Sequence, residues 1–243
     1  MQLVRSGHAG SAALELAVSH ALLTRVAAGE LPSTLRVYRP APAVAFGKLD
    51  TLRPGYARAV QAARAHGYEP VLRLPGGHAA AYHADSLAID IVWALDDPVV
   101  GTHDRFRDEG ERLARALRSL GVDARVGEVP GEYCPGAYSV NARGRVKLIG
   151  TAQRLVRGGA LLGASIVVGD GAGVRAVLDD VYAALEFDWD ATTAGAIDEE
   201  VPGLSLDAVE RAVIAGFDGL EPGSLDEETL AFARRLAPQR SPA

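Results

Sequence analysis

The sequence predicts an α+β fold, in which helices flank a mixed and largely antiparallel sheet. Helix and strand patterns do not alternate regularly along the 243 residues, as they would in a doubly wound parallel sheet. Two long strand patterns in residues 144–169 are separated only by a glycine turn, which indicates an antiparallel centre. The hydrophobic content of 48% supports a buried core, and no break in composition precedes about residue 170. We therefore expect residues 1–243 to form a single domain, with a helical C-terminal segment from about residue 172.

Helices and short strands are mixed in the N-terminal part. Apolar residues recur at helical spacing between Ser11, which can cap a helix, and Gly29, which can end one. Residues 86–95 alternate apolar and polar side chains, which predicts a half-buried strand. The remaining predictions in this part are two strands within 34–48 separated by prolines, a helix over 53–67 and a strand over 70–74.

The C-terminal part combines a helix, a run of strands and a group of helices. A hairpin is expected to turn at Gly158-Gly159, because paired glycines between strand patterns favour tight turns. In order, the predicted elements are a helix from Thr102 to Gly121, strands over 122–127, 138–141 and 145–154 with a turn at 142–144, a helix over 172–186, a helix opening at Ser205, and a helix with the capping box Ser224-x-x-Glu227.

Composition excludes several classes of function. The net charge of −6 and the lack of a basic tract argue against nucleic acid as a partner. The apolar runs are too short to cross a bilayer and the first residues lack a signal-peptide pattern, so we expect no membrane partner and a cytoplasmic location. A single cysteine cannot form an intramolecular disulfide. A small molecule or another protein is the expected partner.

Cys134 and Lys147 are the first candidates for chemistry. Among the 25 basic residues only Lys48 and Lys147 are lysines, so the choice of a compact amine over a guanidinium could matter at either position. Cys134 stands before a Pro135-Gly136 turn, which places its thiol outside a regular strand. A hairpin would bring it close to Lys147, and an ammonium lowers the pKa of a neighbouring thiol. The alternative is that Cys134 is a small buried apolar side chain.

Polar side chains alternate along the strand that follows. Lys147, Thr151 and Gln153 are expected on one face by the period of two, where they would line a common surface. That face could equally be the solvated side of the strand.

A glycine-rich segment precedes the strand over 86–95. Gly76 and Gly77 allow a ligand to approach backbone N–H groups, and Arg73 could face an anionic or carbonyl oxygen. His78 and His83 could be metal ligands or a base, and His83 is the candidate for a Cys-His pair. Because no second Cys or His cluster exists, we predict no metal. The alanines at 79–81 could leave a narrow apolar slot or pack under a helix.

These segments resemble the lipoate-protein ligase and octanoyltransferase superfamily, the biotin/lipoate protein ligase catalytic domains. The segment "RLPGGHAAAYH" is similar to its arginine, glycine and histidine segment, and "KLIGTAQR" to its lysine strand. The order of elements agrees over roughly residues 10–217. The resemblance implies a fold related to class II aminoacyl-tRNA synthetases. It also implies a substrate site that includes Arg73, Gly76, Gly77, His78, His83, Gly150, Thr151 and Gln153.

Within the superfamily, "EYCPGAYSV" looks most like the cysteine loop of octanoyl amidotransferases that move an octanoyl group from the glycine-cleavage H protein to other lipoyl domains. The resemblance implies that Cys134 carries the acyl group as a thioester and that Lys147 orients the acyl carbonyl. It implies no cofactor, an octanoyl or lipoyl ligand, and lipoyl-domain partners such as the H protein and E2 subunits of 2-oxoacid dehydrogenases. Acyl carrier protein is an alternative donor.

Two alternatives stay open. ATP-dependent lipoate ligases use ATP and Mg²⁺, but they usually carry an Asn-Asp pair in this region, which is absent from residues 131–154. The third glycine typical of ligases is also replaced by His78. The second alternative is an acyl-binding module without turnover, since a fold does not guarantee an activity.

Overall fold

A computed structural model describes residues 1–6 and 10–242 of the chain and confirms the predicted α+β fold. Residues 7–9 and 243, which the predicted domain includes, lie outside the described residues. Within the described part, one large sheet has the strand order β11-β1-β2-β6-β10-β9-β8-β7. Its strands are β11 (Glu221–Gly223), β1 (Gln2–Ser6), β2 (Thr34–Tyr38), β6 (Ser86–Ala94), β10 (Gly159–Val167), β9 (Val146–Val156), β8 (Val140–Ala142) and β7 (Ala124–Val126).

The large sheet is mostly antiparallel, as expected. Only the pairs β11·β1 and β1·β2, at one edge, are parallel. A smaller sheet lies beside it, with the order β4-β3-β5. Its strands are β4 (Glu69–Leu72), β3 (Ala43–Phe46) and β5 (Ala80–Tyr82).

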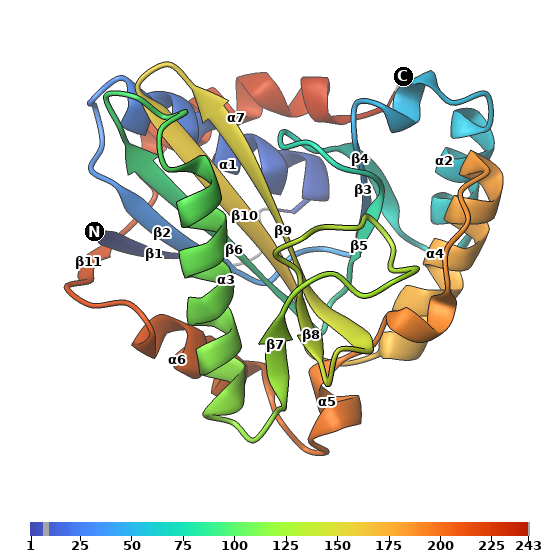
Figure 1. Cartoon of the computed structure of the whole chain (residues 1–243). Coiled ribbons are helices and arrows are strands. Elements are labelled where there is room, and N and C mark those ends of the chain that lie inside the picture. Colours follow the sequence, from blue (N-terminus) through green and yellow to red (C-terminus); the bar gives the residue numbers. More distant parts are fainter. Residues whose placement is uncertain (7–9, 243) are drawn as a thin grey trace.

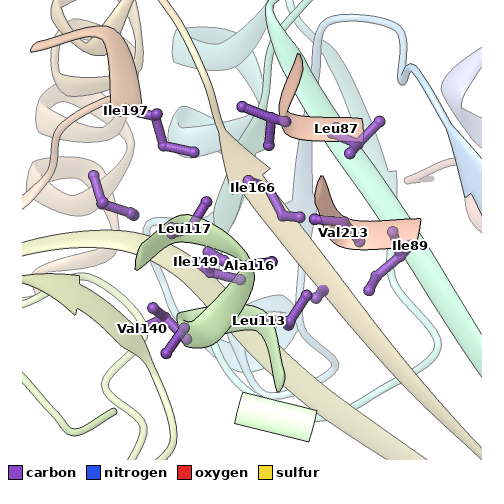
Figure 2. Packing of buried hydrophobic residues seen from close by; sticks show 14 of the residues in the cluster. Leu87, Ile89, Leu113, Ala116, Leu117, Val140, Ile149, Ile166, Ile197 and Val213 are labelled. Atoms are coloured by element: carbon purple, nitrogen blue, oxygen red, sulfur yellow. The ribbon is translucent and has the colours of Figure 1, made fainter. Parts of the chain in front are cut away.

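Helices cover both faces of the large sheet (Figure 1). On one face, α3 (Thr102–Arg118) and α6 (Leu206–Ala215) pack on the main apolar cluster, where leucine, isoleucine and valine side chains interdigitate (Figure 2). On the other face lie α1 (Ala12–Ala27) and α7 (Glu227–Leu236), which share a second cluster with β6 and β10. Helices α2 (Tyr56–Ala65) and α4 (Gly171–Leu185) pack on the small sheet. The short elements are α5 (Ile197–Glu200), η1 (Asp50–Leu52), η2 (Ala191–Thr193) and η3 (Ala237–Arg240).

Side chains on the face toward α1 form two rows across β2, β6, β10 and β9. Residues paired directly between antiparallel strands project from the same face. Asp90 faces α1, because its carboxylate accepts a hydrogen bond of 2.6 Å from Ser19 on that helix. The first row consists of Tyr38, Ala88, Ser165 and Gly150, and the second of Arg36, Asp90, Gly163 and Ala152. Because half of these residues are glycine or alanine, the rows leave space between the sheet and α1.

Several boundaries and exposures differ from the predictions. The strand over 86–95 was expected to be half-buried, but in β6 both faces are buried, since α1 covers the side opposite the main cluster. The hairpin between β9 and β10 turns at residues 157–158, because Gly159 already pairs with Val156. The turn predicted at 142–144 lies one residue later, between β8 and β9, where Arg143 and Gly144 both have positive φ.

Two predicted helix caps are also wrong. Gly101, in the left-handed region with φ 73°, precedes α3, while Thr102 is its first residue and donates its hydroxyl to Val99 O. Asp226 rather than Ser224 caps α7, since its carboxylate accepts from the Thr229 N–H at 2.7 Å. The caps Ser11 and Ser205 are confirmed. The C-terminal segment is mainly helical but contributes the edge strand β11, because its backbone pairs with β1.

No helix in residues 1–6 and 10–242 combines the length and apolar character that crossing a membrane requires.

Candidate active site

Cys134 lies in the loop between β7 and β8, and its backbone is held from both sides. Its φ of 42° is in the left-handed region, which costs of order 1–3 kcal/mol for a residue other than glycine. The Cys134 N–H donates to the Tyr182 hydroxyl of α4 at 2.8 Å. The Cys134 carbonyl accepts from Lys147 Nζ of β9 at 2.8 Å. These two contacts offset the strain and set the direction of the side chain, and the second confirms the predicted proximity of Cys134 and Lys147.

The Cys134 sulfur is surrounded by hydrogen-bond donors. Arg73 Nη2 lies 3.1 Å from Sγ, and the His78 backbone N–H donates to it at 3.2 Å. Burial raises the pKa of this thiol, but the charges of Arg73 and Lys147 and the two hydrogen bonds outweigh burial, so its pKa lies below the ordinary value. The thiolate is the nucleophilic form of cysteine. The arrangement therefore favours a reactive sulfur.

Gly77 explains how the glycine-rich segment reaches the sulfur. Its φ is 95°, and a Cβ at this position would lie 2.0 Å from Arg73 Nη2 and 2.8 Å from Cys134 Sγ. A side chain would thus displace both groups. At Gly76, by contrast, an added Cβ would meet no described atom within 4 Å, so this glycine is not required by close packing.

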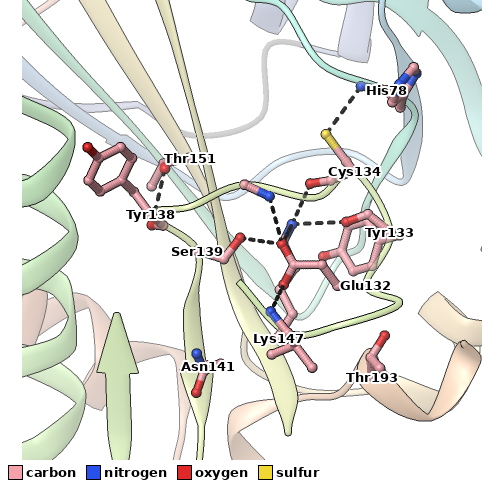
Figure 3. A network of polar contacts seen from close by, with 12 residues as sticks. His78, Glu132, Tyr133, Cys134, Tyr138, Ser139, Asn141, Lys147, Thr151 and Thr193 are labelled. Atoms are coloured by element: carbon pink, nitrogen blue, oxygen red, sulfur yellow. Dashed lines mark hydrogen bonds and ion pairs between the residues drawn. The ribbon is translucent and has the colours of Figure 1, made fainter. Parts of the chain in front are cut away.

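Lys147 is buried, with 2% of its surface exposed, and all three of its N–H donors are used. Nζ donates to Glu132 Oε1 at 3.1 Å, to Tyr133 O at 3.0 Å and to Cys134 O at 2.8 Å (Figure 3). Burial lowers the pKa of Lys147, while the neighbouring charges of Glu132 and Cys134 raise it. Lys147 therefore fastens the cysteine loop to β9.

Glu132 organises the same loop and was not singled out from the sequence. Its Oε1 accepts from Lys147, from the Gly136 N–H at 2.9 Å and from the Ser139 hydroxyl at 2.7 Å, while Oε2 accepts from the Val129 N–H at 3.1 Å. In the sequence Glu132 stands out only as a carboxylate two positions before the cysteine. In a turn-rich segment such a residue cannot be told apart from an ordinary exposed acid. Figure 3 shows the carboxylate between the loop and Lys147.

A pocket opens beside Cys134 and runs over the two rows of the large sheet. It encloses about 690 Å³ of empty space including its open mouth. Cys134, Arg73 and Lys147 lie in its wall, with small residues of β9 and β10 beneath. Its lining includes the apolar side chains of Leu16, Leu74, Ala80, Tyr133, Ala152 and Leu161, and the polar side chains of Ser19, Asp90, Thr151 and Ser165. The pocket has the character of a site for a short apolar chain.

Of the predicted residues on β9, Gly150 and Thr151 line the pocket and Gln153 does not. The Gln153 carboxamide contacts α3 instead, donating to Thr102 O at 2.9 Å and accepting from Arg105 Nε at 3.2 Å. The prediction that Lys147 and Gln153 share a face is therefore wrong. A register shift where β8 pairs with β9 breaks the period of two between them.

The two predicted histidines lie in different places. His78 adjoins Cys134 through its backbone, while its ring faces away from the sulfur, with Nδ1 2.8 Å from Asp50 Oδ1 and the ring 4.4 Å from that of Phe187. His83 has its Nε2 3.0 Å from Asp170 Oδ2, and its Nδ1 accepts from the Asp85 N–H. It does not line the pocket. The structure thus gives no Cys-His pair within hydrogen-bond reach in the described residues.

The described residues contain no group of three or more His, Cys, Asp or Glu side chains placed to hold a metal ion.

The chain is similar to known proteins over most of its length. Residues 11–218 match the protein family described as the lipoyl protein ligase A/B catalytic domain. An octanoyl-[GcvH]:protein N-octanoyltransferase of Geobacillus kaustophilus is 30% identical over 162 residues, which are 67% of this chain and 57% of that protein. The octanoyltransferase LipM of Kyrpidia tusciae is 31% identical over 254 aligned positions, covering 93% of this chain and 91% of that protein. The chain spans about half the length of the octanoyl-[GcvH] relatives that it matches.

Solved structures share the fold. A bi-partite lipoate protein ligase of Thermoplasma acidophilum, described with its E2 lipoyl domain, superimposes with a TM-score of 0.72 at 21% identity, covering 98% of this chain and 92% of that one. At this identity the likeness concerns the fold alone.

Proposed function

Because the chain belongs to the lipoyl protein ligase A/B catalytic domain family, we propose that it moves an octanoyl or lipoyl group onto the acceptor lysine of a lipoyl domain. The observation that carries the proposal is the Cys134 sulfur, which lies in the wall of an apolar pocket with Arg73 and the His78 N–H donating to it. A thiol activated in this way can take an acyl group as a thioester. The reaction then needs no cofactor.

In the first half-reaction, the Cys134 thiolate attacks the acyl carbonyl of the donor. A carbon–sulfur bond forms, the bond between the carbonyl carbon and the donor's leaving group breaks, and the proton lost by the thiol is taken by that leaving group. Arg73 lowers the cost of holding the thiolate before the attack. The product is an acyl thioester on Cys134.

In the second half-reaction, the acceptor lysine amine attacks the thioester carbonyl. A carbon–nitrogen bond forms, the carbon–sulfur bond breaks, and the amine proton restores the Cys134 thiol. The same donors that stabilise the thiolate before the first attack stabilise it here as the leaving group. Lys147 keeps its role of holding the loop, and orienting the acyl carbonyl would require one of its three hydrogen bonds to open.

The pocket supplies the binding energy for the acyl chain. At about 0.8 kcal/mol per buried methylene, six methylenes contribute about 5 kcal/mol. Leu16 and Leu161 provide apolar contacts along the path. This contribution is sufficient for a preference among chain lengths.

The proposed partners are lipoyl-domain proteins. Relatives of the chain are named for transfer from GcvH, and a ligase of the same fold is described with an E2 lipoyl domain. We extend both kinds of partner, the H protein and E2 subunits, to this chain, together with a cytoplasmic location. Acyl carrier protein stays an alternative donor.

The decisive experiment offers three donors in parallel to an apo lipoyl domain: octanoyl-H protein, octanoyl-acyl carrier protein, and lipoate with ATP and Mg²⁺. Intact-protein mass spectrometry should detect an octanoyl adduct on the wild type and none on Cys134→Ala. Cys134→Ser is the matched control, because it keeps a nucleophile of similar shape with a far weaker acidity. Transfer that survives Cys134→Ala and depends on ATP would replace the proposal with a ligase. Labelling by none of the donors would leave a binding module.

A further inference from the structure

Ser165 carries a buried hydroxyl that has no hydrogen-bond partner among the described residues. The residue is only 7% exposed and lies in β10, on the floor of the pocket. A buried hydroxyl without a partner is unfavourable, and such groups in native proteins call for an explanation. Ser19, the other serine of the pocket, has no such deficit, because it donates to Asp90 at 2.6 Å.

Ser165 lies at the catalytic end of the pocket. It pairs across the sheet with Gly150 of β9. A Cβ on Gly150 would lie 3.3 Å from Cε and 3.8 Å from Nζ of Lys147, so the lysine side chain extends over this glycine. Ser165 is therefore the neighbour of the Lys147 side chain, whereas Leu161 lies four residues away along the same strand and belongs to the apolar cluster under α1.

The other donors near the sulfur are largely used. Lys147 donates to three oxygens of the cysteine loop, and Arg73 Nη2 donates to the Cys134 sulfur. Arg73 Nε is buried without a partner in the described residues, like the Ser165 hydroxyl. A serine hydroxyl needs rotation about only one side-chain bond to turn toward a ligand. Two donors without partners thus flank the space beside Cys134.

We propose that the Ser165 hydroxyl donates a hydrogen bond to the carbonyl oxygen of the bound acyl group. The ligand would be an acyl compound with a carbonyl group, an octanoyl thioester or amide. This choice of ligand rests on the proposed function. When the lysine amine attacks the thioester, the carbonyl electron pair moves onto oxygen, and it returns as the carbon–sulfur bond breaks. Ser165 stabilises the charge on that oxygen and gives up no proton. Arg73 Nε is the second donor.

The test uses the full-length protein with ¹³C-carbonyl octanamide in a Cys134→Ala background, where the amide cannot acylate the enzyme. With Ser165 present, the carbonyl stretching frequency of the bound amide should be lower than that of octanamide in a dry apolar solvent, and Ser165→Ala should raise it again. Octanamide affinity should fall by about three- to tenfold, the range expected for one hydrogen bond. With Cys134 intact, the rate of single-turnover transfer should fall on the order of 10²-fold in Ser165→Ala. Ser119→Ala, a serine of the α3 C-terminus outside the pocket, is the control and should behave like the wild type.

A merely structural role of Ser165 would change stability without moving the carbonyl frequency. An unchanged frequency and an unchanged transfer rate in Ser165→Ala would overturn the proposal, as would failure of the Cys134→Ala protein to bind octanamide. The pH profile of Cys134 alkylation should be the same in the wild type and in Ser165→Ala, which separates Ser165 from the groups that activate the thiol. If transfer fails with every donor while octanamide binding still depends on Ser165, the proposed function is wrong and the acyl-carbonyl contact stands.

Discussion

Glu132→Gln tests whether a buried charge pair holds the cysteine loop. The Glu132 side chain is fully buried and that of Lys147 is 2% exposed, with 3.1 Å between Oε1 and Nζ. The carboxylate accepts four hydrogen bonds, three at Oε1 and one at Oε2. Glutamine has the same shape but replaces one acceptor oxygen by an NH₂ donor. Whichever way the amide is oriented, a donor then faces a donor.

The expected loss of stability is large. Removing one partner of a buried ion pair typically costs about 3–5 kcal/mol, because the remaining charge stays buried without compensation. For a chain of 243 residues, about 2–4 °C of melting temperature is lost per kcal/mol, so the fall should be about 6–20 °C. Because Glu132 raises the pKa of Lys147 against burial, its loss should also lower that pKa further and favour the neutral amine. The pKa of Cys134 should then rise, since the Lys147 charge helps to lower it.

Two measurements check this reasoning. Calorimetry compares the melting temperatures of the wild type, Glu132→Gln and the control Glu111→Gln. The control removes an exposed partner of Arg118 and should change the free energy of unfolding by less than about 1 kcal/mol. Alkylation of Cys134 by iodoacetamide as a function of pH follows the thiol. Should Glu132→Gln melt within about 2 °C of the wild type and show the same alkylation profile, the loop does not depend on the buried pair.

Three further predictions concern the same site. Lys147→Arg should reduce the rate of transfer by at least about 10²-fold although the charge is kept. A planar guanidinium cannot make the three convergent hydrogen bonds of the ammonium in a space closed by Glu132. Wild-type rates in this variant would contradict the prediction. Gly77→Ala should slow alkylation and transfer, because its Cβ would overlap Arg73 Nη2 and press on the Cys134 sulfur. Single-turnover rates measure this effect, and the melting temperature checks that the variant is folded. An unaffected rate would count against the close approach of Gly77 to the sulfur. The pH midpoint of alkylation of wild-type Cys134 should lie below the ordinary thiol pKa of about 8.5. Arg73→Met should move this midpoint upward, because the charge that stabilises the thiolate is lost. A midpoint that does not move excludes Arg73 as the main cause of the lowered pKa.

Local sequence patterns were sufficient to predict much of the fold. The helix beginning after Ser11 and the strands over 146–156 and 159–167 were predictable, because cap chemistry and apolar periodicity are properties of neighbouring residues. The caps of α3 and α7 were not, because several residues there can accept or donate, and only the path of the chain selects Gly101 and Asp226. The strands β1 and β11 were missed, since their pairing joins residues 2–4 with residues 221–223, which are far apart in the chain.

In the candidate site, too, some features follow from the sequence alone and others only from the folded structure. The sequence by itself determined that Cys134 lies at a turn, that Lys147 can approach it, and which family its motifs resemble, because residue types and spacing contain this information. Only the tertiary structure decided that Glu132 and Tyr182 hold the cysteine, that the Ser165 hydroxyl has no partner among the described residues, and that Gln153 faces α3. The contacts of Tyr182 and Gln153 join segments far apart in the chain, and the position of Gln153 also depends on the register shift in β9. The contacts of Glu132 depend on the folded path of the loop that holds Cys134. Such contacts have no local pattern, since burial and hydrogen bonding are set by what packs against a residue rather than by its neighbours in sequence.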